Sequence, residues 1–220
     1  MSVTDTSQGL TFHVSCRTLP MMSDLEPGRR ERKKQATRDE LMEHAARLFA
    51  EHGFDAVTTA DIAEAADVSQ RTFFRHFPSK EAVLYGHAHV LRERILTEFA
   101  TRPNDESVVD SVIVSIRAIA SYYKTHHEET FLQARLAADF PAVAAYARAY
   151  VQSDWEHELT AAIAGRMGVD PLADPRPEIL SGAAFAAYRA AVRRWSAAGG
   201  HDTFGTLLDE SLEALGAFRG

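Results

Sequence analysis

Apolar residues recur at three- and four-residue steps over most of the chain, which is the spacing of one face of an α-helix. The first such run starts near residue 32 and stops at Gly53, a residue type that commonly follows the last helical turn. Its apolar residues at three- and four-residue steps are Leu41, Ala45, Leu48 and Phe49. No run of alternating β-branched residues predicts a strand. The pattern therefore predicts an all-α protein.

Two short helices are predicted after this long one. Thr59 is a good N-cap for the first, and Ser69 for the second, Gln70–His76, which ends before Pro78. Residues 67 and 68, between the two, leave room only for a tight turn. Two short helices joined in this way and preceded by a longer helix form a helix-turn-helix, whose second helix normally lies in the major groove of DNA.

The second short helix has two unlike faces. Phe73 and Phe77, four residues apart, can hold it onto the preceding helix, while Gln70, Arg71 and Arg75 fall on the outer side. An ordinary helical hairpin with arginines on its surface has the same period. The periodicity alone leaves both interpretations open.

The rest of the chain keeps the helical period, with breaks at prolines and glycines. We expect about nine helices in all. After the first three, these are a helix capped by Ser79 that continues to near Thr101, followed by Glu106–Lys124, Glu128–Ala138, Pro141–Met167, Pro175–Ala198 and His201–Phe218.

The last two of these helices are rich in apolar and small residues. The final helix carries an apolar stripe, although the core of a monomer could use the same stripe. Small residues on the helix before it allow close approach of helix backbones. The stripe consists of Leu207, Leu208, Leu212, Leu215 and Phe218, and the small residues are Ala183, Ala184, Ala186, Ala187, Ala190 and Ala191.

The composition is that of ordinary globular protein, with 220 residues, 45% of them hydrophobic and 25% charged. No run approaches the roughly 18 apolar residues of a membrane helix. Cys16 is the only cysteine, which excludes an intramolecular disulfide and fits a cytoplasmic location. Residues 1–28 show no sustained period and are expected to form a disordered tail.

The net charge of -7 would argue against nucleic acid as a partner, but the charge is unevenly distributed. The first predicted helix begins with a basic cluster that contains only one acid, Glu31. A local positive field of this kind can contact phosphates on an otherwise acidic protein. The cluster consists of Arg29, Arg30, Arg32, Lys33, Lys34 and Arg38.

The segment GFDAVTTADIAEAADVSQRTFFRHFPSKEAVL resembles the N-terminal DNA-binding domain of TetR-type transcriptional regulators. Phe74 departs from the pattern, because the family usually has Tyr there. The resemblance implies a three-helix DNA-binding domain over 29–85 and a larger helical ligand-binding and dimerisation domain over 86–220. In that family the last two helices form the dimer, and the small residues and the apolar stripe described above suit this contact. The matching positions are Thr58, Thr59, Ile62, Ala63, Val68, Ser69, Thr72, His76, Phe77, Lys80 and Leu84.

The same resemblance implies which residues contact double-stranded DNA. Thr59, His76 and Lys80 are expected on the phosphate backbone. Gln70 suits adenine and Arg71 suits guanine, each through paired hydrogen bonds. The full expected set is Arg30, Lys34, Thr59, Ser69, Gln70, Arg71, Thr72, Phe74, Arg75, His76 and Lys80.

A ligand site is expected among the middle helices, which are rich in aromatic residues. Arg135 and Arg189 lie in otherwise apolar sequence, and could meet an acidic ligand or pair with Asp139 or Glu158. The C-terminal part also resembles mycofactocin-cluster regulators, which implies a hydrophobic or acyl-CoA-like effector. The expected set is Ile116, Tyr122, Tyr123, Phe131, Arg135, Tyr146, Tyr150, Trp155, Tyr188 and Arg189.

Catalytic chemistry has no motif in this sequence. The histidines lack metal-ligand spacing, and no nucleophile elbow or phosphate-binding glycine loop is present, so we expect no metal, no cofactor and no enzyme activity. Two hypotheses remain. The first is a homodimeric, ligand-responsive repressor on a palindromic operator. The second is a helical small-molecule or acyl carrier, or an enzyme, with a vestigial helix-turn-helix.

Overall fold

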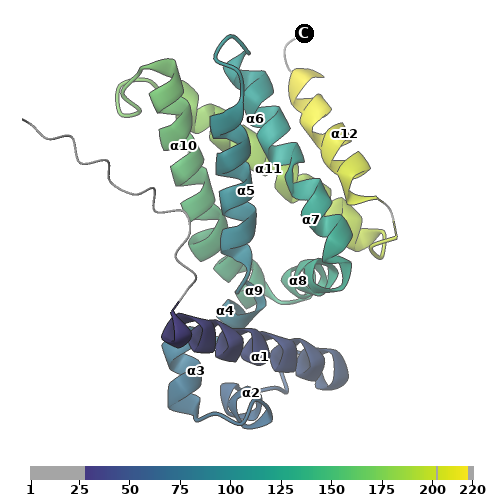
Figure 1. The fold of residues 1–220 in the computed structure, drawn as a ribbon. Coiled ribbons are helices and arrows are strands. Elements are labelled where there is room, and N and C mark those ends of the chain that lie inside the picture. Colours follow the sequence, from purple (N-terminus) through teal and green to yellow (C-terminus); the bar gives the residue numbers. More distant parts are fainter. Residues whose placement is uncertain (1–27, 202, 218–220) are drawn as a thin grey trace, which may run out of the picture.

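The computed structural model describes residues 28–201 and 203–217, and these form helices without a strand. The all-α prediction is confirmed. A small group of helices, the head, lies against one end of a larger bundle, the body (Figure 1). The predicted tail lies outside the described residues except for Gly28, and so does Phe218 of the predicted apolar stripe.

The head consists of α1 (Arg29–His52), α2 (Thr59–Ala65), α3 (Gln70–His76) and α4 (Lys80–Leu84). In Figure 1, α2 and α3 lie on the side of α1 that faces away from the body. The apolar positions predicted from the helical period are buried between these helices. The head core contains Leu41, Ala45, Phe49, Phe54, Val57, Ile62, Ala63, Ala66, Phe73, Phe77, Ala82, Val83 and Leu84.

The first helix boundary of the helix-turn-helix differs by one residue from the prediction. Thr58, not Thr59, caps α2, because Asp61 completes a reciprocal capping box with it. The backbone N–H and side chain of Thr58 both donate to the Asp61 carboxylate, which holds the pKa of Asp61 below its usual range. Ser69 caps α3 as predicted, and α3 has the predicted bounds.

Three helices expected to be long are divided in the structure. The helix expected up to Thr101 is interrupted after α4, and the one expected over Glu106–Lys124 is divided at Ala118. A π-helical segment interrupts the helix expected over Pro141–Met167. The body helices are α5 (Ala88–Thr101), α6 (Val108–Arg117), α7 (Ile119–Thr125), α8 (His127–Asp139), α9 (Pro141–Tyr146), the π-helical η1 (Ala147–Gln152), α10 (Ser153–Met167), α11 (Arg176–Ala197) and α12 (Phe204–Ala217).

The break between α4 and α5 lies where the chain passes close to α1. Gly86, in this break, has no room for a side chain, because an added Cβ would be 2.2 Å from the Met42 sulfur. Helix α5 begins at Ala88. This break is the last part of the chain before the body.

Head and body share apolar packing at their contact. Leu136 of α8 and Val143 of α9 are buried in the head core, although both belong to the body. Tyr85 and Tyr146 pack against both cores, with stacked rings whose centroids are 5.9 Å apart. The head therefore buries part of its apolar surface only while it rests on α8 and α9.

The body core is centred on α11, whose inner face carries several aromatic residues. Tyr123, Trp195 and Phe204 pack their rings together, and the hydroxyls of Tyr123 and Tyr188 are 2.8 Å apart. No helix among the described residues is long and apolar enough to cross a membrane.

The turn between α11 and α12 gives a stability prediction. Gly200 has φ +74°, and an added Cβ would lie 2.6 Å from Cδ2 of Phe131 on α8. We expect Gly200→Ala to lower the free energy of unfolding by about 1–3 kcal/mol in chemical denaturation. Gly165→Ala is the control, because Gly165 is helical with open space around it, and it should raise stability by about 0.5–1 kcal/mol. Equal stabilisation by both changes would contradict the packing at Gly200.

Candidate nucleic-acid interface and ligand cavity

Helix α3 presents a polar and an apolar face, as its sequence predicts. Phe73 is buried in the head core, whereas Arg71, Phe74 and Arg75 are exposed. Phe74 is 50% exposed, a large apolar side chain that the head leaves in solvent. Because α3 lies away from the body, nothing in the described chain covers this outer face (Figure 1).

Four predicted DNA-contacting residues meet at the start of α3. Ser69 Oγ accepts a hydrogen bond from the backbone N–H of Thr72 at 3.1 Å and lies 2.9 Å from its hydroxyl. Gln70 Nε2 donates to Thr59 Oγ1 at 3.0 Å, which links α3 to α2. This hydrogen bond orients the Gln70 side-chain amide. If Gln70 also binds a DNA base, the same amide must contact both the base and Thr59.

A basic hollow lies between the start of α1 and the end of α3. It has a volume of about 600 Å³ and contains two predicted residues from each helix, Arg30 and Lys34 with Arg75 and His76. Glu31 pairs with Lys34 at 3.3 Å, an exposed pair that contributes little stability. The remaining excess of positive charge makes the hollow attractive to phosphates.

His76 also lines this hollow. Burial lowers the pKa of His76, and the positive charges of Arg75, Arg38 and Lys34 lower it further. Its Nε2 is buried without a hydrogen-bond partner in the described chain. A phosphate oxygen that reaches this atom can accept a hydrogen bond if Nε2 carries the proton.

Lys80 has a structural role that the sequence did not reveal. Its Nζ donates to the carbonyl oxygens of Phe54 at 2.6 Å and Val57 at 2.9 Å, and lies 4.1 Å from the centre of the Phe54 ring. This group therefore fixes the turn between α1 and α2, and the phosphate contact expected of Lys80 stays a prediction.

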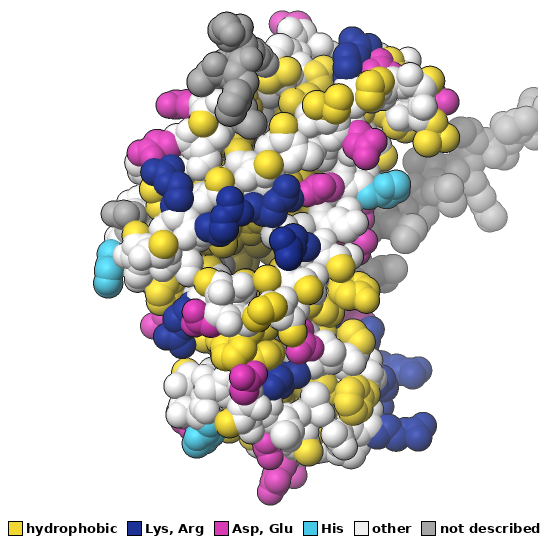
Figure 2. Space-filling model, turned by 180° about the vertical axis from the view of Figure 1, so that it is seen from behind, with side chains coloured by type: hydrophobic (Ala, Val, Ile, Leu, Met, Phe, Trp, Pro, Cys, Tyr) yellow, Lys and Arg dark blue, Asp and Glu magenta, His cyan; other side chains and the backbone are white. Residues whose placement is uncertain are grey.

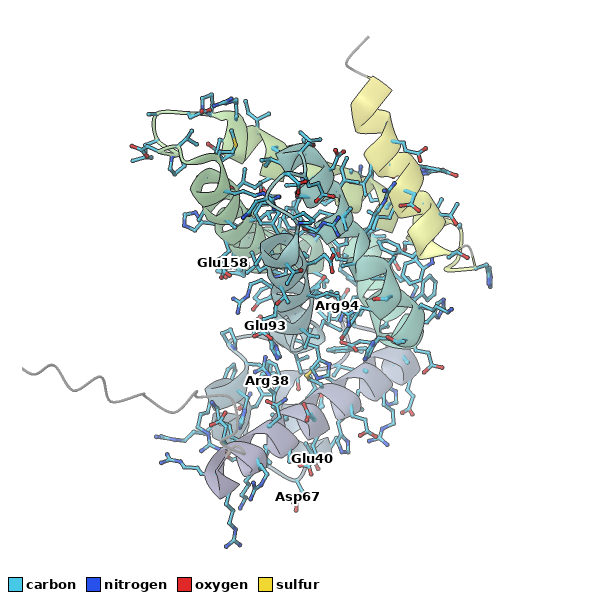
Figure 3. The ribbon with its side chains drawn as sticks, turned by 45° about the horizontal axis from the view of Figure 1, so that its top comes forward. Arg38, Glu40, Asp67, Glu93, Arg94 and Glu158 are labelled. Carbon is cyan, nitrogen blue, oxygen red and sulfur yellow. The ribbon has the colours of Figure 1, made fainter. Side chains whose placement is uncertain are left out.

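Arg38 is a further residue whose role the sequence did not reveal, although it belongs to the predicted basic cluster. Its guanidinium donates to the carbonyl oxygens of His76 at 2.9 Å and Gly86 at 3.2 Å, and lies 4.2 Å from the Phe77 ring centre. Burial lowers its pKa. Figure 3 shows Arg38 between α1 and the body. One side chain thus connects the end of α3 to the break before α5.

The body contains a nearly closed inner cavity of about 30 Å³. Three predicted ligand residues line it, namely Tyr122, Trp155 and Tyr188. Burial raises the pKa of Tyr188 to about 12, so its hydroxyl keeps its proton. Residues that the sequence pattern did not indicate complete the lining, and these are Tyr85, His87, Ala88, Leu91, Glu129, Gln133, Ala147, Val151 and Gln152.

The polar side of this cavity is organised around Glu129. Its carboxylate accepts hydrogen bonds from Gln133 Nε2 at 3.2 Å and from the Tyr122 hydroxyl at 3.5 Å, and His87 Nδ1 is also 3.5 Å away. Gln133 Nε2 additionally donates to the carbonyl of Leu84, the last residue of α4, at 2.6 Å. The cavity wall is therefore hydrogen-bonded to the head.

The other predicted ligand residues lie elsewhere. Ile116 and Tyr123 are buried in the body core, and Phe131 packs against Trp195. Tyr146 and Tyr150 lie on a separate surface hollow near the head, where Tyr150 is 67% exposed.

The two predicted arginines line an outer groove on α8 and α11. Arg189 pairs with Glu156 at 2.6 Å. The predicted partners were Asp139 and Glu158, but Glu158 pairs with Arg92 at 3.2 Å. Figure 3 labels Glu158 on α10, whose neighbouring turn also carries Glu156.

Family models match both parts of the chain. Residues 41–85 match the bacterial regulatory proteins of the tetR family, and residues 106–219 match the MftR C-terminal domain. The regulator TcmR of Streptomyces glaucescens is 34% identical over 176 residues, which cover 77% of each chain. The chain belongs to the TetR family. It is a TetR-family DNA-binding transcriptional regulator.

Two further relatives are repressors. The transcriptional repressor KstR2 of Rhodococcus jostii is 34% identical over 104 residues, covering 44% of this chain and 51% of that one. The crystal structure of Thermus thermophilus FadR, a TetR-family repressor in complex with lauroyl-CoA, is 25% identical with a TM-score of 0.52. That match covers 81% of this chain and 92% of FadR.

Within this TetR-family chain, the described residues contain no group of three or more His, Cys, Asp or Glu side chains placed to hold a metal ion. The histidine pair at the start of α8 has other contacts. His126 stacks on Tyr122 with ring centres 3.9 Å apart, and His127 Nε2 lies 2.9 Å from the carbonyl oxygen of Gly200.

Lys80→Met tests the structural role of Lys80 in the TetR-type head. Loss of two hydrogen bonds to buried carbonyls should lower the free energy of unfolding by about 1–3 kcal/mol, measured by chemical denaturation. If Lys80 acts only through these two carbonyls, the slope of DNA affinity against salt should stay unchanged. A flatter salt slope with unchanged stability would instead identify Lys80 as a phosphate contact.

His87 gives the joint between head and body a pH dependence. Its ring nitrogens are 3.5 Å from Asp39 of α1 and 3.5 Å from Glu129 of α8. The hydrogen bond to Glu129 is the largest cause that raises the pKa of His87, and Asp39 adds to it against the effect of burial.

Because the folded-state pKa is raised, this contribution to stability is complete below about pH 6.5 and is lost as the pH rises through the folded pKa. The melting temperature of the native chain should therefore fall more between about pH 6 and pH 8 than that of His87→Gln. Parallel pH profiles of the two proteins would exclude a charged bridge at His87.

Proposed function

We propose that this chain is a ligand-responsive repressor, which binds a palindromic operator as a homodimer and leaves it when a hydrophobic or acyl-CoA-like effector binds. On this proposal, residues 29–85 bind DNA, and residues 86–220 bind the effector and form the dimer. The likeness to the repressor KstR2, and to the FadR repressor in complex with lauroyl-CoA, supports this function. The observation that carries the proposal is a series of hydrogen bonds between the wall of the inner cavity and α3, the helix expected to contact DNA bases and called the reading helix below.

The connection runs through the break between α4 and α5. Gln133, in the cavity wall, holds the carbonyl of Leu84, and Arg38 holds both Gly86 and the end of α3. Tyr85 and His87 line the cavity from the same short stretch. On this proposal, a displacement of the cavity wall reaches α3 through hydrogen bonds to three carbonyl groups, those of Leu84, Gly86 and His76.

The small size of the inner cavity implies that the body must expand when an effector binds. At about 30 Å³ it holds little more than one water, whereas pockets for small ligands typically measure about 300–1,000 Å³. An effector can bind there only if the surrounding helices separate. Since an effector shifts an equilibrium only by its difference in affinity between two states, it favours the expanded body and with it a displaced head.

Dimerisation places two reading helices on two half-sites. The outward face of α11 is lined by small residues, Ala183, Ala186 and Ala190, beside Ile179, which is 65% exposed. The other three alanines predicted for this contact, Ala184, Ala187 and Ala191, are buried in the chain's own core. The outer alanines allow close approach of a second α11.

Fluorescence anisotropy with the DNA that flanks the chain's own gene tests the proposal. Binding should weaken by roughly 10³–10⁵ between about 50 and 200 mM salt if 6–10 phosphates are contacted, and dodecanoyl-CoA should release the DNA. Specific DNA binding that no hydrophobic compound relieves would discard the effector. Ligand binding without any DNA affinity would favour the alternative, a helical carrier or enzyme.

Arg71→Ala tests the reading helix. Arg71 is exposed at the start of α3, and its loss should weaken operator binding by about 1–3 kcal/mol while relaxing the preference at one base position. Arg94→Ala is the control, because Arg94 is an exposed arginine on α5 of the body. Equal weakening by Arg71→Ala on every DNA sequence would make Arg71 a backbone contact.

A further inference from the structure

The outer groove on α8 and α11 has a volume of about 590 Å³, far larger than the inner cavity of about 30 Å³. Four arginines line it, Arg135 of α8, Arg148 of η1, and Arg189 and Arg193 of α11. Figure 2 shows Lys and Arg side chains gathered around a hollow in the middle of the rear face, with apolar side chains inside it. The arginines come from three separate elements, so helical spacing alone does not explain their convergence.

The charges in this groove are not balanced. Arg189 is neutralised by Glu156 at 2.6 Å. Arg135, Arg148 and Arg193 are exposed, and none of them has an ion pair with a carboxylate in the described chain. Asp139 is the one acidic residue that lines the groove. Three neighbouring guanidinium groups repel one another, and a bound anion with several negative charges removes this repulsion.

The groove and the inner cavity share a wall. Ala147 and Gln152, at the two ends of η1, line both. A π-helical turn inside a run of α-helix is an irregular feature that often occurs at functional sites. Gln152 Oε1 is buried without a hydrogen-bond partner in the described part of the chain, and thus leaves an acceptor available between the two spaces.

We propose that the effector is an amphipathic organic phosphate, whose phosphate groups bind Arg135, Arg148 and Arg193 while its apolar part passes η1 into the inner cavity. Guanidinium groups bind phosphate oxygens through paired hydrogen bonds, and the apolar floor of the groove leads toward an aromatic cavity. This inference rests on the proposed function and assigns the anionic end of its effector to a site. It also gives a reason for the position of η1, between the polar and apolar parts of one ligand.

Three probes separate the two ends of such a ligand. Dodecanoyl-CoA carries both the phosphate groups and a twelve-carbon acyl chain. Coenzyme A carries only the phosphate groups, and dodecanoate carries only the acyl chain, with a single carboxylate. Their affinities are measured by isothermal titration calorimetry on the full chain. The groove variant is Arg148→Gln/Arg193→Gln, and the control is Arg47→Gln/Arg94→Gln, which removes the same charge from exposed positions on α1 and α5.

We expect native and control proteins to bind dodecanoyl-CoA equally, and the groove variant to bind it at least about tenfold more weakly, since two charge-assisted contacts are lost. Dodecanoate should bind all three proteins with the same low affinity, and coenzyme A should bind the native chain more weakly than dodecanoyl-CoA. The salt dependence of dodecanoyl-CoA binding should be flatter for the groove variant.

Equal dodecanoyl-CoA affinity in the groove variant and the native chain would overturn the proposal, and so would the failure of all three probes to bind. If coenzyme A binds as tightly as dodecanoyl-CoA, the acyl chain of the ligand does not enter the cavity, and this result would also contradict the proposal. Operator binding is measured on the same preparations. If DNA is bound and released by a hydrophobic compound while the groove variant behaves normally, only the groove assignment fails. If no DNA is bound, the proposed function fails.

Discussion

The position of α3 relative to the body depends on the guanidinium of Arg38. Helix ends leave carbonyl groups without partners, and Arg38 satisfies one at the end of α3 and another at the break before α5. Because a half-buried cation loses hydration, its place is fixed by these two acceptors and by the Phe77 ring rather than by solvent. The head can move relative to the body only if this arrangement moves as a unit or breaks.

The shared core makes that movement costly but possible. Leu136 and Val143 belong to the body and are buried among head residues, so the two parts cannot separate without exposing apolar surface. A shift of α8 and α9 can nevertheless carry the head along while keeping this contact. This packing thus favours a displacement of the head as one rigid unit over its detachment, and on the proposed function such a displacement changes the distance between the two α3 helices of a dimer.

Features encoded by neighbouring residues could be predicted from the sequence, and features encoded by distant ones could not. The bounds of α3, its Ser69 cap and the burial of Phe73 follow from local periodicity and capping. The break at Gly86 and the carbonyl contacts of Lys80 depend on which helix passes nearby. Glu156 replaces Glu158 as the partner of Arg189 because a two-residue step moves a side chain about 200° around a helix. The polar lining of the cavity was missed because charged residues are seldom expected in an apolar core.

The π-helical segment has an evolutionary consequence. Its hydrogen bonds span one residue more than those of an α-helix, so it amounts to a single inserted residue within the run from Pro141 to Met167. Loss of one codon there would restore a regular helix and leave α9 and α10 in their present orientation, because the bulge absorbs the extra residue. Only the residues of η1 itself, among them Arg148 and Ala147, would change direction. One small deletion could therefore reshape the wall that the outer groove and the inner cavity share, without altering the head.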